Sequence, residues 1–507
     1  MIHEFMSNQG GFEIEADAVV IGSGAGGAIS AYNLASAGMK TVLLESGPPA
    51  GPAQFTHNAP EFLAKYYWEG GLRLTGGNAA QPMMQGRMLG GSTVVNSAIM
   101  YELPDWVKDE WHKDDGVSFL YTDAAKNSVK RIFKQLRVEK TPRKSYGRRN
   151  ELVEEVFKNC GLTPNPLPRA VVNCEGSGDC LTGCSGQKKQ SVDISYIQPA
   201  LEKGLQVFTS CHVDKILMEG NRATGVTGDV ILDEGRTRSG KFRVMAPIVI
   251  VAAGATHTPV ILQKSGFKKA GKDLQVHITG ALFALMAEEV HPWVGASQGV
   301  GAFSDDIRGL KYESLWASNS VMSVKWGSFG PDYFKNLRDL KRSLLIAGVY
   351  RGKTSGAVSS GLLEPRIKIW VKKKEVQQLF KGLYRLAPGF MKAGAEFVYS
   401  GMPGTKAQMK TEEDFRALLN PKLGFSDISS TMNHLFCSCP MTADRKRAVV
   451  DFEGRVLGSS NIYVADASLF PSPSAVNPQV TVMMLSDLVS RRVASLKDGD
   501  YLEQAGR

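Results

Sequence analysis

DAVVIGSGAGG, residues 17–27, is the stretch that decides the fold. Its first five residues form a short apolar run typical of a buried strand, and three glycines follow at the spacing G-x-G-x-x-G. An alanine-rich segment, 28–37, predicts a helix, and 41–44 predicts a second strand that ends at Glu45. Strand, glycine turn, helix and strand in this order predict a βαβ unit, and hence an α/β fold with a dinucleotide site.

The three glycines and Glu45 have separate roles in such a unit. Gly22 allows a tight turn, Gly24 lets the backbone approach a pyrophosphate, and Gly27 permits close packing of the helix on the strand. The helix N-terminus favours the pyrophosphate anion, and a carboxylate at Glu45 can accept hydrogen bonds from ribose hydroxyls. The unit predicts dinucleotide binding, but by itself it does not distinguish FAD from NAD.

The length and composition describe a globular protein of more than one domain. The chain has 507 residues, 43% of them hydrophobic and 22% charged. Its net charge of +10 comes from scattered basic stretches without interleaved aromatic residues, so we expect no nucleic-acid partner and at most peripheral membrane contact. Residues 1–16 do not resemble a secretory signal, no apolar run could span a bilayer, and seven cysteines are an odd number for a disulfide framework. These features predict a cytoplasmic location.

The sequence pattern changes twice along the chain, which predicts two domains. From about residue 275 to 430 the strands are longer, and an amphipathic helix is expected near 374–397. Outside this stretch the pattern is typical of short buried strands, and a helix is expected at 481–496. We therefore predict a cofactor domain from residues 1–275 and 430–507, with an α+β substrate-binding domain, 275–430, inserted into it.

Three further segments distinguish between the dinucleotides. They are GRMLGGSTVVN at 86–96, GATHTPVILQKSG at 254–266, and NIYVADASLFP at 461–471, the last followed by Asn477-Pro478 and Thr481. In this order they resemble motifs of the glucose–methanol–choline (GMC) oxidoreductase family. The resemblance implies an FAD cofactor, an FAD-binding Rossmann-like domain, and an inserted α+β substrate-binding domain, as in p-hydroxybenzoate hydroxylase.

The resemblance also assigns residues to the cofactor site. Together with the glycine turn it gives this set: Gly22, Gly24, Gly27, Glu45, Arg87, Gly91, Ser92, Asn96, Val213, Ala253, Asp466, Ala467, Asn477, Pro478 and Thr481. Gly91, Ser92 and Asn96 would line the isoalloxazine. Val213 would lie near the adenine, and Asp466 near the phosphates or the ribityl chain. The alternative role of the glycines and of Asp466 is turn and cap chemistry.

The position before the loop asparagine bears on how FAD is held. Some members of the family link FAD covalently through a histidine at this position. Val95 stands there in this sequence, so we expect FAD to be bound non-covalently.

Alcohol oxidation needs a group that accepts the hydroxyl proton as the hydride leaves, and a neutral imidazole suits this task near pH 7. His434, in TMNHLFCSCPM at 431–441, matches the family's catalytic histidine, although the loop after it departs from the family's pattern. Asn477 matches the second member of the catalytic pair and, with Pro478 after it, resembles cholesterol oxidases and long-chain alcohol oxidases. An amide cannot act as a base and can only orient the hydroxyl. Structural roles are expected for His212, His257 and His277.

The cysteine-bearing stretch 174–184 is ambiguous. Thiolates at Cys174, Cys180 and Cys184 could ligate an iron–sulfur cluster, and a similar spacing occurs in catalytic subunits of membrane-linked bacterial glucose and fructose dehydrogenases. Free thiols are the favoured alternative in a reducing compartment, so no metal is expected. Zinc is less favoured still, because the motif lacks a clear fourth ligand.

The resemblance to GMC oxidoreductases, and of Asn477-Pro478 to cholesterol and long-chain alcohol oxidases, implies FAD-dependent oxidation of a hydrophobic alcohol, long-chain aliphatic or sterol, to an aldehyde or ketone. The resemblance implies hydride transfer to flavin N5 with His434 as the base. Electrons would then pass to oxygen, a quinone or an electron-acceptor protein. Three alternatives stay open: a redox-neutral flavoenzyme on the same fold (a lyase or decarboxylase), a dehydrogenase with an iron–sulfur relay to a partner protein, and a flavoprotein that has lost catalysis and serves as a binding or electron-carrier module. Retention of His434 argues against the last. The sequence does not decide between oxidase and dehydrogenase.

Overall fold

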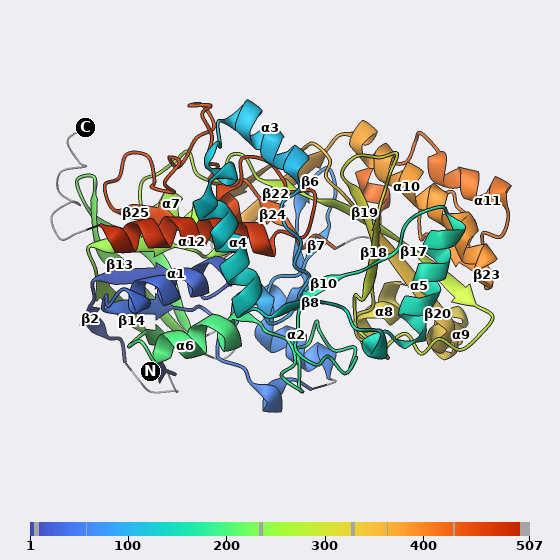
Figure 1. Cartoon of the computed structure of the whole chain (residues 1–507), viewed down its shortest axis with the longest axis horizontal. Helices are drawn as coiled ribbons and strands as arrows, with labels where there is room; N and C mark the ends of the chain where they lie inside the picture. The colour runs from blue at the N-terminus through green and yellow to red at the C-terminus, as the bar shows by residue number, and fades with distance from the viewer. Residues whose placement is uncertain are drawn as a thin grey trace.

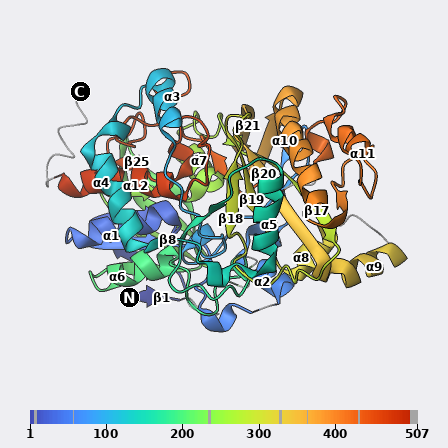
Figure 2. The same cartoon turned by 45° about the vertical axis from the view of Figure 1, so that its right-hand side comes forward.

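The computed structural model describes residues 1–4, 10–56, 58–232, 237–325, 330–361, 364–428 and 431–496. Two halves lie side by side along the long axis, each built around its own six-stranded sheet (Figures 1 and 2). Among the described residues, no helix is both long enough and apolar enough to cross a lipid bilayer.

The sheet of the first half is parallel and buried on both faces. Its strand order is β1 (Ile2–His3), β11 (Gln206–Phe208), β4 (Thr41–Leu44), β3 (Ala18–Ile21), β15 (Ile248–Val251) and β25 (Ile462–Val464). Every residue of β3, β4, β15 and β25 is buried, because helices and a second sheet cover both faces, and this explains their continuous apolar sequences. Helices α1 (Ala25–Ser36) and α12 (Gln479–Ser495) pack against each other beside this sheet (Figure 1).

The βαβ unit predicted from the sequence is confirmed, with one difference in its helix. The strands at 17–21 and 41–44 are β3 and β4. The helix begins at Ala25 and not at residue 28, because Gly26 and Gly27 adopt helical geometry inside its first turn. The predicted C-terminal helix at 481–496 is α12.

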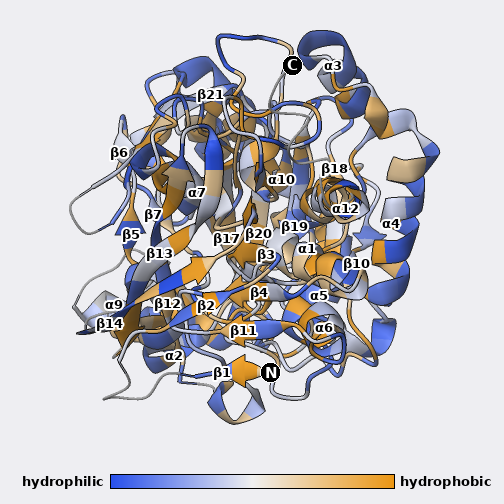
Figure 3. Ribbon diagram, turned by 90° about the vertical axis from the view of Figure 1, so that its left-hand side faces the viewer, coloured by the Kyte–Doolittle hydropathy of each residue, from blue (hydrophilic) through white to orange (hydrophobic). Residues whose placement is uncertain are grey.

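A four-stranded sheet completes the first half. Its strand order is β12 (Cys211–Glu219), β13 (Arg222–Leu232), β14 (Thr237–Met245) and β2 (Glu13–Glu15). Ile216, Val226 and Phe242 from these strands join the same hydrophobic core as β3 and β15. Figure 3, which looks onto this half, shows mostly apolar central strands and a hydrophilic helix α4 (Asp123–Gln135) at the rim.

The second half contains an antiparallel sheet. Its strand order is β23 (Ala395–Tyr399), β17 (Ile278–Met286), β20 (Ser343–Tyr350), β19 (Leu310–Ser314), β18 (Val300–Phe303) and β9 (Asn165–Pro166). Side chains alternate between its two faces. Leu282 and Ile346 point to the face that packs on α10 (Lys373–Lys392) and α5 (Gly147–Asn159). Phe283 and Leu345 point to the opposite face and form a separate apolar cluster with Trp316.

The division of the chain at residues 275 and 430 stays a prediction. Strand β17 begins the second sheet at Ile278, close to the first boundary, whereas Ser430 lies outside the described residues. Helix α5 and strand β9 fall within the predicted cofactor domain, yet they pack with the second sheet, because the apolar face of α5 is buried in the second core. The amphipathic helix expected near 374–397 is α10, which ends at Lys392; Gly394, with a φ of +92°, then turns the chain into β23.

Short elements connect the halves and shape the region between them. The helices are α2 (Ala59–Tyr66), α3 (Asp105–Asp115), α6 (Gln198–Leu201), α7 (Gly254–Lys264), α8 (Asn319–Lys325), α9 (Pro331–Asp339) and α11 (Glu412–Arg416). The strands are β5 (Arg73–Leu74), β6 (Gly76–Gly77), β7 (Pro82–Met83), β8 (Val138–Lys140), β10 (Pro168–Ala170), β16 (Gln275–Val276), β21 (Thr354–Ser359), β22 (Arg366–Val371) and β24 (Leu435–Phe436). The antiparallel pairing of β16 with β24 aligns Val276 with Leu435, and this register brings His277 beside His434.

Candidate active site

One cavity gathers the predicted site residues at the carboxyl ends of β3, β4 and β15, where ligands bind in parallel α/β sheets. The predicted residues that line it are Gly22, Gly24, Glu45, Gly91, Ser92, Asn96, Val213, Ala253, His434, Asp466, Ala467, Asn477 and Pro478. Gly27, Arg87 and Thr481 were also predicted for the site, but they do not line the cavity. Cofactor and catalytic candidates from both ends of the chain therefore share one space.

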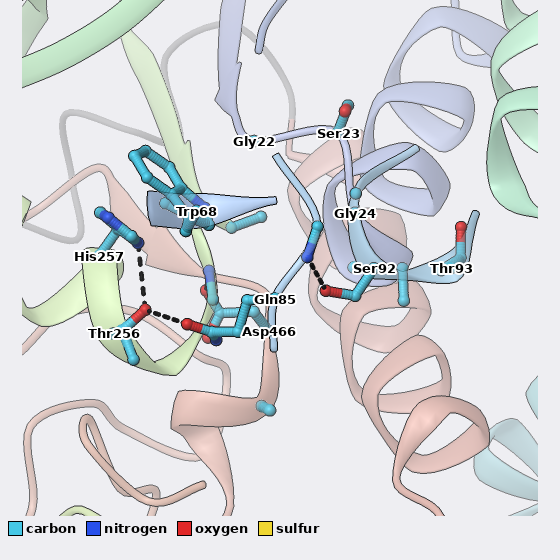
Figure 4. A pocket seen from close by; sticks show the side chains of 18 of the residues that line it. Gly22, Ser23, Gly24, Trp68, Gln85, Ser92, Thr93, Thr256, His257 and Asp466 are labelled. Atoms are coloured by element: carbon cyan, nitrogen blue, oxygen red, sulfur yellow. Dashed lines mark hydrogen bonds between the residues drawn. The ribbon is translucent and has the colours of Figure 1, made fainter. Parts of the chain in front are cut away.

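The glycine turn has two glycines that the fold requires and one that a ligand would require. A Cβ on Gly22 would lie 2.5 Å from the Ala252 carbonyl oxygen, and one on Gly27 would lie 1.8 Å from the Gly22 carbonyl oxygen. A Cβ on Gly24 would meet nothing within 4 Å, although Gly24 faces the cavity (Figure 4). Gly24 is also the N-cap of α1 and gives that helix no side-chain cap. An uncapped helix N-terminus beside open space fits a pyrophosphate.

Glu45 closes the same end of the cavity. Its carboxylate accepts hydrogen bonds from the backbone N–H of Ser23 (3.0 Å), the hydroxyl of Ser23 (2.6 Å) and the N–H of Gly47 (2.7 Å). Burial raises the pKa of Glu45, and these hydrogen bonds oppose the shift. The bonds hold the carboxylate against the glycine turn, where it can also accept bonds from ribose hydroxyls.

Aromatic rings form the wall beside Val213, which was predicted to lie near the adenine. The Trp68 ring stacks on His257 with 4.1 Å between centroids (Figure 4). It also meets His212 edge-on, with 6.2 Å between centroids. Burial lowers the pKa of His212 to about 4 and holds that of His257 well below its usual range, so both rings are neutral at pH 7. The expectation that His257 packs in this region agrees with its position. Trp68 carried no signal in the sequence analysis.

Asp466 and Asn96 are held by protein contacts at the cavity edge. Asp466 accepts hydrogen bonds from the N–H of Gly254 (2.8 Å), the hydroxyl of Thr258 (2.5 Å) and the N–H of Ser468 (2.8 Å). It therefore ties the start of α7 to the segment after β25. Asn96 donates from Nδ2 to Gln479 Oε1 at 2.7 Å, which joins the 86–96 loop to the start of α12.

A contact between two histidines defines the protonation pattern of the catalytic candidate. The Nδ1 atoms of His277 and His434 lie 3.0 Å apart, and His277 Nε2 is hydrogen-bonded to the Ser474 carbonyl oxygen. A carbonyl oxygen can only accept, so His277 carries its proton on Nε2. Its Nδ1 is then an acceptor, and His434 must donate from Nδ1. The Nε2 atom of His434 is left with a lone pair, as a proton acceptor requires.

The surroundings of His434 keep it neutral. Burial, reinforced by the positive charge of Lys311, lowers the pKa of His434 to about 3. Burial and the neighbouring His434 also hold the pKa of His277 well below its usual range. His277 was expected to have only a structural role; the structure instead places it in direct contact with His434.

Two of the three cysteines in 174–184 contact a guanidinium group. Arg169 donates from Nη2 to Cys180 Sγ (3.1 Å) and from Nη1 to Cys174 Sγ (3.8 Å). Burial opposes ionisation of Cys180, but the Arg169 and Lys189 cations outweigh it and lower the pKa of Cys180 to about 7. Within the described part of the chain, no group of three or more histidine, cysteine or acidic side chains is arranged to hold a metal ion.

The chain matches known proteins along most of its length. Two family models, both described as GMC oxidoreductase, match residues 16–279 and 354–486. A GMC-type oxidoreductase of Sinorhizobium fredii is 28% identical and aligns over 98% of this chain and 98% of its own length. A long-chain-alcohol oxidase of Arabidopsis thaliana is 25% identical over 96% of this chain and 67% of its own length.

Solved structures share the fold at low sequence identity. Pyridoxine 4-oxidase from Mesorbium loti superposes with a TM-score of 0.71 at 15% identity, covering 95% of this chain and 99% of that one. Formate oxidase of Aspergillus oryzae gives 0.70 at 15% identity, with 95% and 98% covered. The two family models together span more than half of the sequence. The protein therefore belongs to the GMC oxidoreductase family and is an FAD-dependent oxidoreductase.

Proposed function

We propose that the protein oxidises the hydroxyl group of a hydrophobic alcohol to an aldehyde or ketone. The observation that carries the proposal is the contact between His277 and His434, because it leaves a lone pair on His434 Nε2 in a cavity that Asn477 also lines. An alcohol whose O–H donates to Nε2 would lose its proton there as its carbon–hydrogen bond breaks. Asn477 would orient the hydroxyl oxygen. When bound, FAD supplies the acceptor for the hydride that leaves the carbon.

The residues that would hold FAD are those at the opposite end of the cavity. The open space at Gly24 and the N-terminus of α1 would take the pyrophosphate, and Glu45 would take the ribose hydroxyls. Val213, next to the wall formed by Trp68, would lie near the adenine. Val95 offers no nucleophile, so the cofactor would be held by these non-covalent contacts alone.

A hydrophobic substrate is supported by the apolar cluster on the second sheet. Leu181 lines the cavity and also packs against the cluster that contains Phe283, Leu345 and Trp316. An aliphatic chain that follows this side would leave water for a carbon-lined surface, a gain of about 0.8 kcal/mol for each buried CH₂ group. The likeness to the long-chain-alcohol oxidase of Arabidopsis thaliana favours the same substrate class.

Among the described residues, the alternative functions lack the side chains that they need. A decarboxylase needs a free cation to hold the carboxylate, but Lys264, which lines the cavity, is paired with Asp214. Lys311, the buried cation beside His434, is paired with Glu313 and does not line the cavity. An iron–sulfur relay needs gathered ligands, and two of the three cysteines at 174–184, Cys174 and Cys180, contact Arg169 instead. Oxygen, a quinone or an acceptor protein could each receive the electrons.

Anaerobic absorbance spectroscopy of the FAD-loaded protein tests the proposal. We expect 1-dodecanol to bleach the flavin bands, and the affinity for primary alcohols to rise about fourfold per added CH₂ group over part of the series from butanol to dodecanol. Ethanol at the same concentration is the matched control. Readmitting oxygen then separates an oxidase, whose flavin bands return at once, from a dehydrogenase, whose bands return only when a quinone is added.

Two results would contradict the proposal. If no aliphatic alcohol or sterol bleaches the flavin, the substrate class is wrong and a redox-neutral reaction becomes the better hypothesis. If bleaching occurs but is independent of chain length, the apolar cluster does not contact the substrate, and a small polar alcohol is favoured.

A further inference from the structure

A buried ion pair lies behind the catalytic end of the cavity. Lys311 and Glu313, both on β19, form a salt bridge in which each residue is almost fully enclosed, with 2% and 3% of its surface exposed. Leu310, which precedes the pair, and Tyr312, which lies between its members, point to the opposite face and pack in the second core. The register pairs Glu313 with Ala347, so the ion pair shares the face that carries the apolar cluster.

The lysine fixes the orientation of one amide. Lys311 Nζ donates to Asn477 Oδ1 at 2.5 Å. An ammonium group has three donors and no acceptor, so it can bind only the oxygen of the amide. The Nδ2 group of Asn477 is therefore turned away from Lys311, which does not line the cavity, while Asn477 itself does.

Glu313 fixes the amide of Gln298, and it does so by binding the amide nitrogen, whereas Lys311 binds the amide oxygen of Asn477. Gln298 Nε2 donates to Glu313 Oε2 at 2.8 Å. A carboxylate engaged with an ammonium group can only accept, so it binds the nitrogen of the amide and turns Oε1 away. Gln298 also lines the cavity. One ion pair thus controls two amides on the cavity wall, one through each of its charges.

We propose that Lys311 and Glu313 are positioning residues that present an N–H donor from Asn477 and a C=O acceptor from Gln298 to the substrate. The donor would bind the substrate oxygen, leaving its O–H to point at His434. The acceptor would bind a second donor group, such as another hydroxyl or an amide N–H on the substrate. Bonds to charged groups are about twice as strong as neutral ones, so neither amide flips easily. This inference rests on the proposed function for its chemistry, but not for the amide orientations.

A double variant removes both charges that orient the amides of Asn477 and Gln298, and it leaves no unpaired ion in the interior. Lys311→Met together with Glu313→Gln keeps the net charge and nearly the same volume, whereas either change alone leaves one ion unpaired. The probe is decanamide, an uncharged amide that cannot be oxidised and offers both a C=O and an N–H₂ group. Its binding is measured by the change it causes in the visible spectrum of the FAD-loaded protein. We expect about tenfold weaker binding or more in the double variant, with unchanged FAD content.

A mutant cycle separates positioning from a general loss of structure. Asn477→Ala is made in the wild-type and in the double-variant background, and the rate of flavin reduction by 1-dodecanol is measured anaerobically. If Lys311 acts through Asn477, the double variant alone is slowed about tenfold or more, and adding it to Asn477→Ala slows reduction only slightly further. Equal slowing in both backgrounds, or no slowing and no change in decanamide binding, would overturn the proposal.

Gln298→Met keeps the proposal testable if the double variant does not fold, because it leaves the ion pair of Lys311 and Glu313 intact. Lys311 still holds Asn477 in this variant, while the acceptor of Gln298 is lost. Weaker binding of decanamide supports the proposed acceptor, and unchanged binding of decanamide contradicts it. If dodecanol fails to reduce even the wild-type flavin, the proposed function is wrong, but the decanamide measurements still decide the amide orientations.

Discussion

The two ends of the cavity are built in different ways. At the cofactor end, Gly22, Gly24 and Glu45 come from one βαβ unit, and the backbone N–H groups of Ser23 and Gly47 donate to Glu45. The catalytic end gathers side chains from segments up to 200 residues apart, namely His277, Lys311, His434 and Asn477. His277 sets the tautomer of His434, and Lys311 sets the orientation of the Asn477 amide. The geometry of the glycine turn and Glu45 is thus a local property of the chain, whereas the proposed chemistry depends on how the two halves pack.

Removal of the base should have the largest effect and would show that the catalytic end is needed for chemistry but not for cofactor binding. We expect His434→Ala to slow flavin reduction by 1-dodecanol about 10³-fold, because no other group in contact with the substrate would take the hydroxyl proton. The rate is measured by anaerobic stopped-flow absorbance, with FAD content as the control. A loss of less than about tenfold would remove His434 from the proposed mechanism.

The contact between His277 and His434 allows a test of whether His277 fixes the tautomer of His434. We expect His277→Leu to slow flavin reduction about 10- to 100-fold, because His434 then loses the acceptor that holds its proton on Nδ1. His277→Asn is the matched control, since its amide oxygen can accept from His434 Nδ1. If both variants are equally slow, His277 supports packing and does not fix the tautomer.

A single added Cβ atom at Gly24 tests the proposed pyrophosphate position at the cofactor end. We expect Gly24→Ala to fold normally but to bind FAD about tenfold more weakly or worse, because its Cβ occupies only the open space at the start of α1. Gly51→Ala, whose Cβ meets nothing closer than 3.7 Å and does not line the cavity, is the control. The FAD dissociation constant is measured by fluorescence titration. Unchanged affinity would place the pyrophosphate elsewhere.

The same contrast explains what the sequence could predict. Strands β3 and β4, the glycine turn and Glu45 were predictable because strand, turn and helix signals are local. His434 and Asn477 were found only through resemblance to the GMC family, and both line the cavity. His277 was assigned a structural role, because its contact with His434 arises from the pairing of β16 with β24, two strands that no local pattern connects.

The buried charges were also missed, although the sequence held a signal for them. In LKYES, residues 310–314, Lys311 and Glu313 alternate with Leu310 and Tyr312, which places two opposite charges on one face of a strand. On an exposed strand this pattern is ordinary. Only the structure shows that the charged face is the one turned toward Asn477 and Gln298.

Acidification should lower the stability of the folded protein through buried histidines at both ends of the cavity, and the effect should be smallest near neutral pH. The pKa values of His212 and His257 at the cofactor end, and of His277 and His434 at the catalytic end, all lie below the unfolded value of about 6.5 because the rings are buried. The folded protein therefore binds fewer protons than the unfolded chain below that pH. Stability should be complete above pH about 6.5 and fall as the pH drops toward the folded pKa values, about 4 for His212 and about 3 for His434.

The melting temperature between pH 8 and pH 4 checks this expectation, and a variant tells the two ends apart. His277, with 2% of its surface exposed, should by itself contribute a loss of up to about 1.4 kcal/mol per pH unit in this range. We therefore expect His277→Asn to flatten the acid side of the profile while leaving the melting temperature above pH 7 less affected. An unchanged acid slope would mean that the His277 ring binds its proton as readily in the folded protein as in the unfolded chain. Below a pH of about 6.5, His434 would then face a cation in place of an acceptor, and the tautomer on which its role as a base depends would be lost.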